Sequence, residues 1–199
     1  MADSHGQVET ILKTLAVLVD MNCRPIYHIG DVCDSARPET AAACLAPLRY
    51  YGVKIIKGNN DHTIVANHSG RVRSPVSAEV LQYLKNLPVV LEYGRAILAH
   101  SLPFFKELGL SCMIGNMGTP EIMRILREFP DRIIFRGHSH APEIAWLQKR
   151  QIVRRPLVAG EKCCLSDKFP CVVTCGALTC GYFMVWDAAE NVIGCHQFR

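Results

Sequence analysis

Residues 53–61 read Val-Lys-Ile-Ile-Lys-Gly-Asn-Asn-Asp, a short apolar run that ends in glycine and three polar residues. Residues 25–31, Pro-Ile-Tyr-His-Ile-Gly-Asp, end in a similar way. Each run is typical of a buried strand, and residues 38–51 between them have a helical pattern that Gly52 stops. Strand, helix and strand together form the βαβ unit, in which ligands bind beyond the carboxyl ends of the strands. The sequence therefore predicts an α/β fold with polar residues gathered where strands end.

Further elements extend this pattern along the chain. Apolar residues at helical spacing predict helices over residues 8–19, 77–86 and 119–129, with Thr119 as the cap of the last one. Short apolar runs predict strands at residues 89–92, 95–99, 132–136, 144–147, 170–175, 181–186 and 191–196. Residues 62–76 have no periodicity, which predicts a mobile loop or a small cap. We find no internal repeat or linker, so we expect residues 1–199 to form a single domain.

Composition excludes several classes of protein. Of the 199 residues, 49% are apolar and 20% are charged, which excludes a disordered chain, a collagen-like chain and a coiled coil. The net charge of +4 is too small to indicate nucleic acid as a partner. The longest apolar stretch near the start, residues 15–19, is too short to span a bilayer, and no basic segment typical of a signal peptide precedes it. We therefore expect a cytoplasmic protein with no membrane partner.

The ten cysteines are interpreted in that setting. Cytosolic thiols are mostly reduced, and no C-x-x-C spacing typical of a zinc knuckle occurs. Cys163, Cys164, Cys171, Cys175 and Cys180 nevertheless cluster in the sequence. We interpret them as small buried apolar residues, with a structural metal or redox site as the alternative.

Five polar clusters follow predicted strands, or would do so if a strand preceded the first of them. They are Asp3-Ser4-His5, Gly30-Asp31, Gly58-Asn59-Asn60-Asp61, His100 and Gly137-His138-Ser139-His140. Carboxylate, amide and imidazole ligands together suit a borderline divalent ion such as manganese, iron or zinc. In D-x-H and H-x-H, alternate residues of an extended segment point to the same side and can grip an ion together. Seven such side chains are too many for one ion and suit two ions that share a bridging carboxylate.

The order of these clusters resembles that of the calcineurin-like metallophosphoesterases, and it is most similar to their small bacterial and archaeal phosphodiesterase branch. D-x-H, G-D, G-N-x-D, a lone His and G-H-x-H appear in that order between Asp3 and His140. Residues 172–177, followed by a predicted strand, also resemble that branch. The resemblance implies a four-layer α/β/β/α sandwich with the site at the strand ends. It also implies hydrolysis of a phosphate ester by a metal-bridging hydroxide that attacks phosphorus.

The resemblance assigns roles residue by residue. Asp31 matches the bridging carboxylate, and Asp31, Asn59 and His100 match the residues that activate the attacking water. The implied metal ligands form two sets: Asp3, His5 and His140 for one ion, and Asn59, His100 and His138 for the other. The cofactors implied are two divalent ions, with manganese favoured and iron, zinc, nickel and cobalt as alternatives.

One departure from the family pattern concerns the general acid. Many relatives have histidine after the metal-binding asparagine, where this chain has Asn60. The acid is therefore unassigned, with His62 or His68 as candidates. Asn60 and Asp61 are expected to orient the ligands from behind.

A second departure concerns the strand that precedes D-x-H in the family. Only Met1 and Ala2 precede Asp3 here. Either the true start lies upstream of Met1, which we favour, or the chain has a truncated first strand. In the second case Asp3 and His5 would be poorly anchored, since ligands must be held on rigid elements.

We therefore expect a dinuclear metal-dependent phosphoesterase that acts on a phosphorylated small molecule, with phosphodiesters favoured over monoesters. Arg71 and Arg73 are candidates for contact with substrate phosphate. Basic residues at 149–150 and 154–155 are interpreted instead as a solvated strand edge. The alternatives are a non-catalytic interaction scaffold with this fold, a phosphomonoesterase and a nuclease. A homo-oligomer is compatible with each of them.

Overall fold

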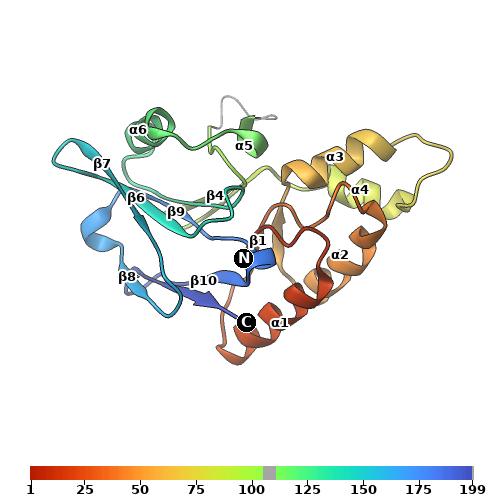
Figure 1. Ribbon diagram of the computed structural model, residues 1–199, viewed down its shortest axis with the longest axis horizontal. Helices are drawn as coiled ribbons and strands as arrows, with labels where there is room; N and C mark the ends of the chain where they lie inside the picture. The colour runs from red at the N-terminus through yellow and green to blue at the C-terminus, as the bar shows by residue number, and fades with distance from the viewer. Residues whose placement is uncertain (105–110, 199) are drawn as a thin grey trace.

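The computed structural model describes residues 1–104 and 111–198 and shows a mixed α/β fold, as the sequence predicts (Figure 1). In the view of Figure 1, α1 to α4 lie together on one side of the molecule. The helices are α1 (Val8–Asp20), α2 (Ala41–Tyr50), α3 (Asn59–His68), α4 (Ala78–Asn86), α5 (Ser111–Ile114) and α6 (Thr119–Glu128). No helix in these described ranges combines the length and apolar character needed to cross a membrane.

The strands form three sheets. β1 (Tyr27–Ile29) and β2 (Lys54–Ile56) pair in parallel, as the βαβ pattern predicts. A six-stranded sheet has the order β3-β4-β5-β9-β6-β7 and a three-stranded sheet the order β10-β11-β8. The strands of these two sheets are β3 (Val90–Tyr93), β4 (Ala96–Ala99), β5 (Ile133–Arg136), β6 (Glu143–Gln148), β7 (Gln151–Pro156), β8 (Lys162–Cys164), β9 (Cys171–Thr174), β10 (Tyr182–Asp187) and β11 (Val192–Gln197). Because β4, β5 and β9 run parallel, their carboxyl ends lie at one edge of the sheet.

Three clusters of buried apolar side chains hold these elements together. The first packs α1, α2, α3 and α4 around β2, through residues such as Leu15, Leu48 and Ile55. The second joins the six-stranded and three-stranded sheets, with Phe135 and Ile193 among its members. The third packs α6 on the six-stranded sheet. Burial of apolar side chains on this scale is the main source of stability. The stacking of the elements into four layers stays a prediction.

The first residues of the chain run beside β1. Ile29 N donates to Met1 O at 2.8 Å, and Asp3 N donates to Gly30 O at 3.1 Å. On the other side, Leu178 N donates to Ala2 O at 2.9 Å. Asp3 is fully buried. Hydrogen bonds on both sides of residues 1–3 therefore anchor Asp3, and the weak anchoring considered from the sequence does not apply to it.

The prediction of a loop at residues 62–76 is wrong for residues 62–68, and the alternative of a small cap stays a prediction. Residues 59–68 form α3, which begins after Gly58. Asp61 caps this helix, because its Oδ2 accepts a hydrogen bond from Gly58 N at 2.9 Å, and Ile64 is buried on its inner face. A capped helix with one buried apolar position has too weak a periodicity for sequence analysis to find.

Other boundaries also differ from the prediction. Gly118, not Thr119, is the cap of α6, because Glu121 Oε2 accepts a hydrogen bond from Gly118 N. β7 and β8 were not predicted. β7 is the outer strand of its sheet and is half polar, so it lacks a continuous apolar run. Arg154 and Arg155 lie on this outer strand, in agreement with their interpretation as a strand edge.

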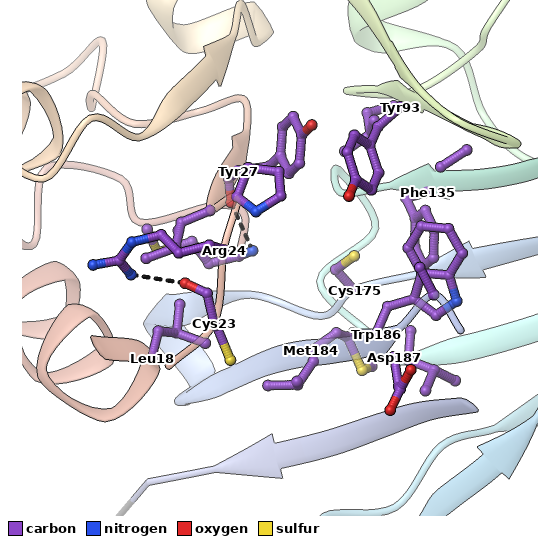
Figure 2. Close-up of a pocket in the computed structure, with 18 of the residues that line it drawn as sticks. Leu18, Cys23, Arg24, Tyr27, Tyr93, Phe135, Cys175, Met184, Trp186 and Asp187 are labelled. Carbon is purple, nitrogen blue, oxygen red and sulfur yellow. Dashed lines mark hydrogen bonds between the residues drawn. The ribbon is translucent and has the colours of Figure 1, made fainter. Parts of the chain in front are cut away.

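A cavity of about 370 Å³ opens beside β1 and β10 (Figure 2). Apolar and aromatic side chains dominate its wall, among them Tyr27, Tyr93, Phe135 and Trp186. None of the seven carboxylate, amide and imidazole side chains singled out as ligands lines it. This cavity is therefore separate from the site that the sequence motifs predict.

Candidate metal centre

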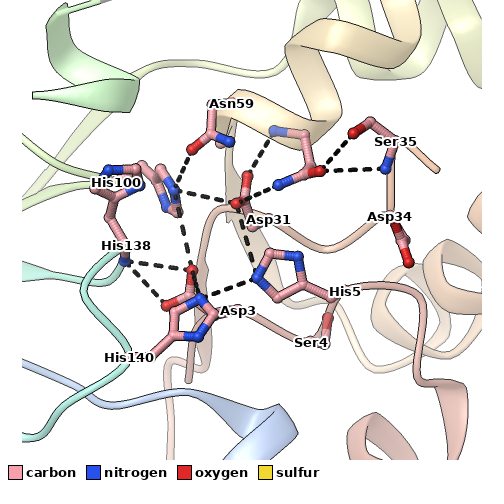
Figure 3. Close-up of polar contacts among 12 residues, drawn as sticks. Asp3, Ser4, His5, Asp31, Asp34, Ser35, Asn59, His100, His138 and His140 are labelled. Carbon is pink, nitrogen blue, oxygen red and sulfur yellow. Dashed lines mark hydrogen bonds and ion pairs between the residues drawn. The ribbon is translucent and has the colours of Figure 1, made fainter.

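The fold brings the polar clusters of the sequence together (Figure 3). Asp31 follows β1, Asn59 follows β2, and His100 follows β4. His138 and His140 follow β5, and residues 1–3 beside β1 deliver Asp3 and then His5. Segments separated by up to 137 positions in the sequence, from Asp3 to His140, thus converge at one place. This is the arrangement expected when the carboxyl ends of neighbouring strands meet.

His100 is fully buried at the centre of this cluster. Its Nδ1 lies 2.8 Å from Ile29 O, and because a carbonyl oxygen can only accept, Nδ1 carries the proton. Its Nε2 faces the carboxylates, 3.5 Å from Asp31 Oδ2 and 4.0 Å from Asp3 Oδ1. The backbone therefore fixes the ring so that Nε2 is directed at the position where a cation would lie.

The imidazoles of His5 and His140 face the carboxylates of Asp3 and Asp31 from another side. His5 Nε2 lies 3.1 Å from His140 Nε2. Asp3 Oδ1 is 3.7 Å from His140 Nε2, and Asp31 Oδ2 is 3.9 Å from His5 Nε2. Potential ligand atoms of Asp3, His5 and His140 lie within 4.8 Å of one another, as do those of Asp3, Asp31 and His100.

Asn59 joins the cluster from the first turn of α3. One terminal atom of its amide lies 3.2 Å from His100 Nε2 and 3.1 Å from His138 Nδ1. With the amide nitrogen at that position, Asn59 can donate to the imidazoles; with the oxygen there, it can join them in binding a cation. The two orientations differ only by a rotation of the amide group.

The backbone at the cluster is strained. Among the described residues, nine non-glycine residues have positive φ, and five of them belong to the cluster: Asp3 (55°), His5 (43°), Asp31 (53°), His138 (67°) and His140 (59°). A side chain in this left-handed region costs roughly 1–2 kcal/mol. Such strain persists where surrounding contacts enforce it, and it concentrates at functional sites.

Burial and neighbouring charges set the ionisation of the cluster. Burial raises the pKa of Asp3 to about 7, and the charge of Asp31 adds to this effect while His100 opposes it. For Asp31, burial is outweighed by hydrogen bonds from His100 and Asn60, which hold its pKa at about 2. Burial lowers the pKa of His138 to about 4, and the charges of His100 and Arg136 lower it further. At neutral pH, His138 is therefore unprotonated and able to bind a cation.

Asn60 and Asp61 make hydrogen bonds beside the cluster. Asn60 donates to both oxygens of Asp31, through its backbone N and its Nδ2, each at 2.8 Å. Its Oδ1 in turn accepts a hydrogen bond from Ser35 Oγ at 2.7 Å. Asp61 Oδ1 accepts from Cys33 N at 3.0 Å, so this buried carboxylate ties the loop after β1 to the start of α3. Asn60 therefore fixes the carboxylate of Asp31 directly, and Asp61 fixes the loop that follows it.

The tight packing around His100 also explains why position 30 is a glycine. Gly30 has a φ of +81°, and a Cβ at this position would lie 2.5 Å from His100 Nδ1. A larger residue here would therefore displace His100 from the cluster.

Three residues singled out by the sequence lie apart from these contacts. In the described ranges, no hydrogen bond or ion pair joins the side chain of His62, Arg71 or Arg73 to the cluster. His62 lies in α3, and Arg71 and Arg73 follow that helix and are exposed.

Two arginines that sequence analysis missed do contact the loops of the cluster. Arg37 Nη2 donates to His5 O at 3.1 Å. Arg136 is buried below the loops that follow β4 and β5. A basic residue inside an otherwise apolar strand was the available signal for Arg136, and Arg37 had none.

The cysteines take no part in the cluster. All ten are free thiols. Cys163, Cys171 and Cys175 are buried, as interpreted, whereas Cys164 and Cys180 are exposed, so that interpretation is wrong for these two. The candidate metal-binding groups found among the described residues contain no cysteine.

Comparison with known proteins defines the family. The sequence model of the calcineurin-like phosphoesterase superfamily domain matches residues 1–175. The chain belongs to this superfamily. Members of the superfamily are generally hydrolases and typically bind divalent metal ions, which agrees with the donor set of the cluster. No curated protein sequence matches the chain significantly.

Solved structures share the fold of this calcineurin-like domain. A metallophosphoesterase from Sphaerobacter thermophilus superposes with a TM-score of 0.74 at 19% identity, covering 100% of this chain and 87% of its own. A hypothetical protein from Pyrococcus horikoshii OT3 gives a TM-score of 0.62 at 15% identity, with coverages of 100% and 86%. A candidate diadenosine tetraphosphatase gives 0.61 at 11% identity, with coverages of 100% and 92%. At these identities the structures establish the common fold.

Proposed function

We propose that the chain is a dinuclear metal-dependent phosphoesterase that prefers phosphodiesters. The observation that carries this proposal is the convergence of two buried carboxylates, one amide and four imidazoles, held by a strained backbone. The charge of Asp31 raises the pKa of Asp3, so the two buried carboxylates disfavour each other's ionisation, and a bound cation would relieve this repulsion. A mixed oxygen and imidazole set of this kind fits manganese, iron or zinc.

The geometry supports a division of the ligands into two sets. We assign Asp3, His5 and His140 to one ion, because their ligand atoms lie within 4.8 Å of one another. Asn59, His100 and His138 are assigned to the other ion. Asp31 is the bridge, because its Oδ2 lies between the sets, 3.9 Å from His5 Nε2 and 3.5 Å from His100 Nε2. Its low pKa keeps it ionised, as a shared ligand must be.

When bound, the two ions supply Lewis-acid polarisation of the phosphoryl oxygens and lower the pKa of the water that attacks phosphorus. The protein holds the metal ligands in fixed orientations before any ion binds. Asn60 orients Asp31, the Ile29 carbonyl orients His100, and burial excludes bulk water from the carboxylates. His5 and His140 are partly exposed and form the side of the cluster that substrate can approach.

The substrate class follows from the same considerations. The site binds phosphate through metal ions, so a phosphorylated small molecule fits it. The structural similarity to a candidate diadenosine tetraphosphatase supports this class. Manganese is the metal we favour.

The test is hydrolysis of bis-p-nitrophenyl phosphate by metal-stripped protein, with and without added Mn²⁺, beside the variant Asp31→Asn. The monoester p-nitrophenyl phosphate is assayed in parallel. We expect Mn²⁺-dependent turnover that is faster on the diester and is lost in the variant. Absence of turnover with Mn²⁺, Fe²⁺, Zn²⁺, Ni²⁺ and Co²⁺ would contradict the proposal and favour a non-catalytic scaffold.

A further inference from the structure

Arg136 is the largest side chain in the described protein that is almost completely buried, with 1% of its surface exposed. It is the last residue of β5 and directly precedes the loop that carries His138 and His140. The guanidinium of arginine is charged at neutral pH. Burying such a charge is costly unless hydrogen bonds compensate for the lost water. The question is what this buried charge does.

The guanidinium donates hydrogen bonds in three directions. Nε and Nη2 donate to the carbonyl O and the Oγ of Ser101, at 3.2 Å and 3.3 Å. Nη1 donates to Ser139 Oγ and, at 3.4 Å, to Thr174 Oγ1. In the described part of the chain these acceptors are all neutral oxygens, so Arg136 is not one half of a simple ion pair.

The three acceptor residues belong to three different strand ends. Ser101 comes directly after His100 at the end of β4, and Ser139 lies between His138 and His140 after β5. Thr174 is the last residue of β9. One planar group therefore joins the two loops that together carry three imidazoles of the cluster. Among the described residues, the backbone adds one direct hydrogen bond between these loops, from Gly137 N to His100 O at 3.1 Å.

The chemistry of arginine suits this task. Its guanidinium presents five N–H donors in a rigid plane, so several acceptors can be held at fixed relative positions. Lysine has one rotatable ammonium group and cannot reproduce that geometry. The fixed geometry of these hydrogen bonds gives a reason for burying the Arg136 guanidinium although it has no ion-pair partner among the described residues.

We propose that Arg136 is a positioning residue, whose guanidinium fixes His100 relative to His138 and His140 and so preorganises the metal ligands. This inference rests on the proposed function of the cluster as a metal centre. Outer contacts of this kind typically change metal affinity or activity by about 10–100-fold.

The experiment measures Mn²⁺ affinity by calorimetry, together with kcat, KM and thermal unfolding, for Arg136→Lys and Arg136→Met. The matched control is Arg132→Lys, just before the other end of β5, where the side chain pairs with Glu92 and is partly exposed. We expect both Arg136 variants to bind Mn²⁺ about 10–100-fold more weakly, with kcat reduced at saturating metal. Arg132→Lys should match the wild type. A purely structural role would lower the unfolding temperature and leave the affinity of the folded protein unchanged, and that result would overturn the proposal.

A less disruptive variant tests the same contact if the Arg136→Met protein does not fold. Ser139→Ala removes one acceptor, and we expect weaker Mn²⁺ binding that is not additive with Arg136→Lys, because both changes break the same contact. Additive effects would overturn the proposal. If wild-type protein binds no divalent ion, the proposed function fails and this inference fails with it. If wild type binds metal and Arg136→Lys binds it equally well, only the role of Arg136 is refuted.

Discussion

The two ends of β1 make opposite kinds of site. At its carboxyl end, Asp31 lies in a tightly packed, polar cluster with a strained backbone. At its amino end, Tyr27 lines a cavity of about 370 Å³ with mostly apolar and aromatic walls. None of the seven side chains assigned as metal ligands lines this cavity. Chemistry is therefore indicated here by convergent polar groups and strain rather than by empty volume.

The largest effect should come from Asp31→Asn. Removing the bridging charge takes away several kcal/mol of transition-state stabilisation, so kcat/KM should fall by about 10³-fold or more. The measurement is steady-state hydrolysis of bis-p-nitrophenyl phosphate with Mn²⁺. At the other end of β1, Trp186→Phe in the cavity wall should leave kcat/KM within about twofold of wild type. A similar loss of kcat/KM in both variants would contradict the assignment of the chemistry to the carboxyl end of β1.

Gly30→Ala tests whether packing behind the cluster matters. The added methyl would lie 2.5 Å from His100 Nδ1, so the imidazole must move, and we expect about 10–100-fold weaker Mn²⁺ binding. Gly52→Ala is the matched control. It also has positive φ, at +66°, but has no atom within 4 Å of the added carbon. That variant should lose about 1 kcal/mol of stability and keep its metal affinity. Equal affinities in the two variants would contradict the packing argument.

Metal affinity should depend on pH through Asp3. Its pKa is raised to about 7, so it must release a proton before it can bind a cation, and Mn²⁺ affinity should rise as the pH increases from 5 to 7. In the metal-free protein, the contribution of Asp3 to the free energy of unfolding has the opposite trend and decreases as the pH rises. Because the folded state holds this proton more tightly than the unfolded state, the contribution of Asp3 to stability is present at about pH 4 and is lost as the pH rises through 7. Calorimetry at several pH values checks the first trend, and an affinity that does not change between pH 5 and 7 would refute it.

The smallest effect is expected for the exposed arginines after α3. In the double variant Arg71→Ala, Arg73→Ala, KM should rise by less than about threefold with kcat unchanged, because exposed charges act weakly through water. Substrate titration of this variant is the measurement. A tenfold or larger rise in KM would show that this segment contacts the substrate.

The sequence predicts the cluster better than it predicts the elements around it. Glycine and polar residues after apolar runs mark the ends of β1, β2, β4 and β5, and these ends meet as the βαβ pattern indicates. α3 was missed because Ile64 is its one buried apolar residue and its cap is formed by the Asp61 side chain. The hydrogen bonds from Asn60 to Asp31 and from Arg136 to Ser101 join residues far apart in the sequence, so no local pattern identifies these partners. The anchoring of Asp3 likewise depends on Leu178, far along the chain.

Anomalous diffraction from crystals of the protein grown with Mn²⁺ would locate the bound ions and identify the residues that hold them. We expect two manganese peaks, one on either side of the Asp31 carboxylate. One should be bound by Asp3, His5 and His140, and the other by Asn59, His100 and His138. No peak at the cluster, or peaks confined to the cavity at the amino end of β1 or to the cysteines, would contradict this assignment.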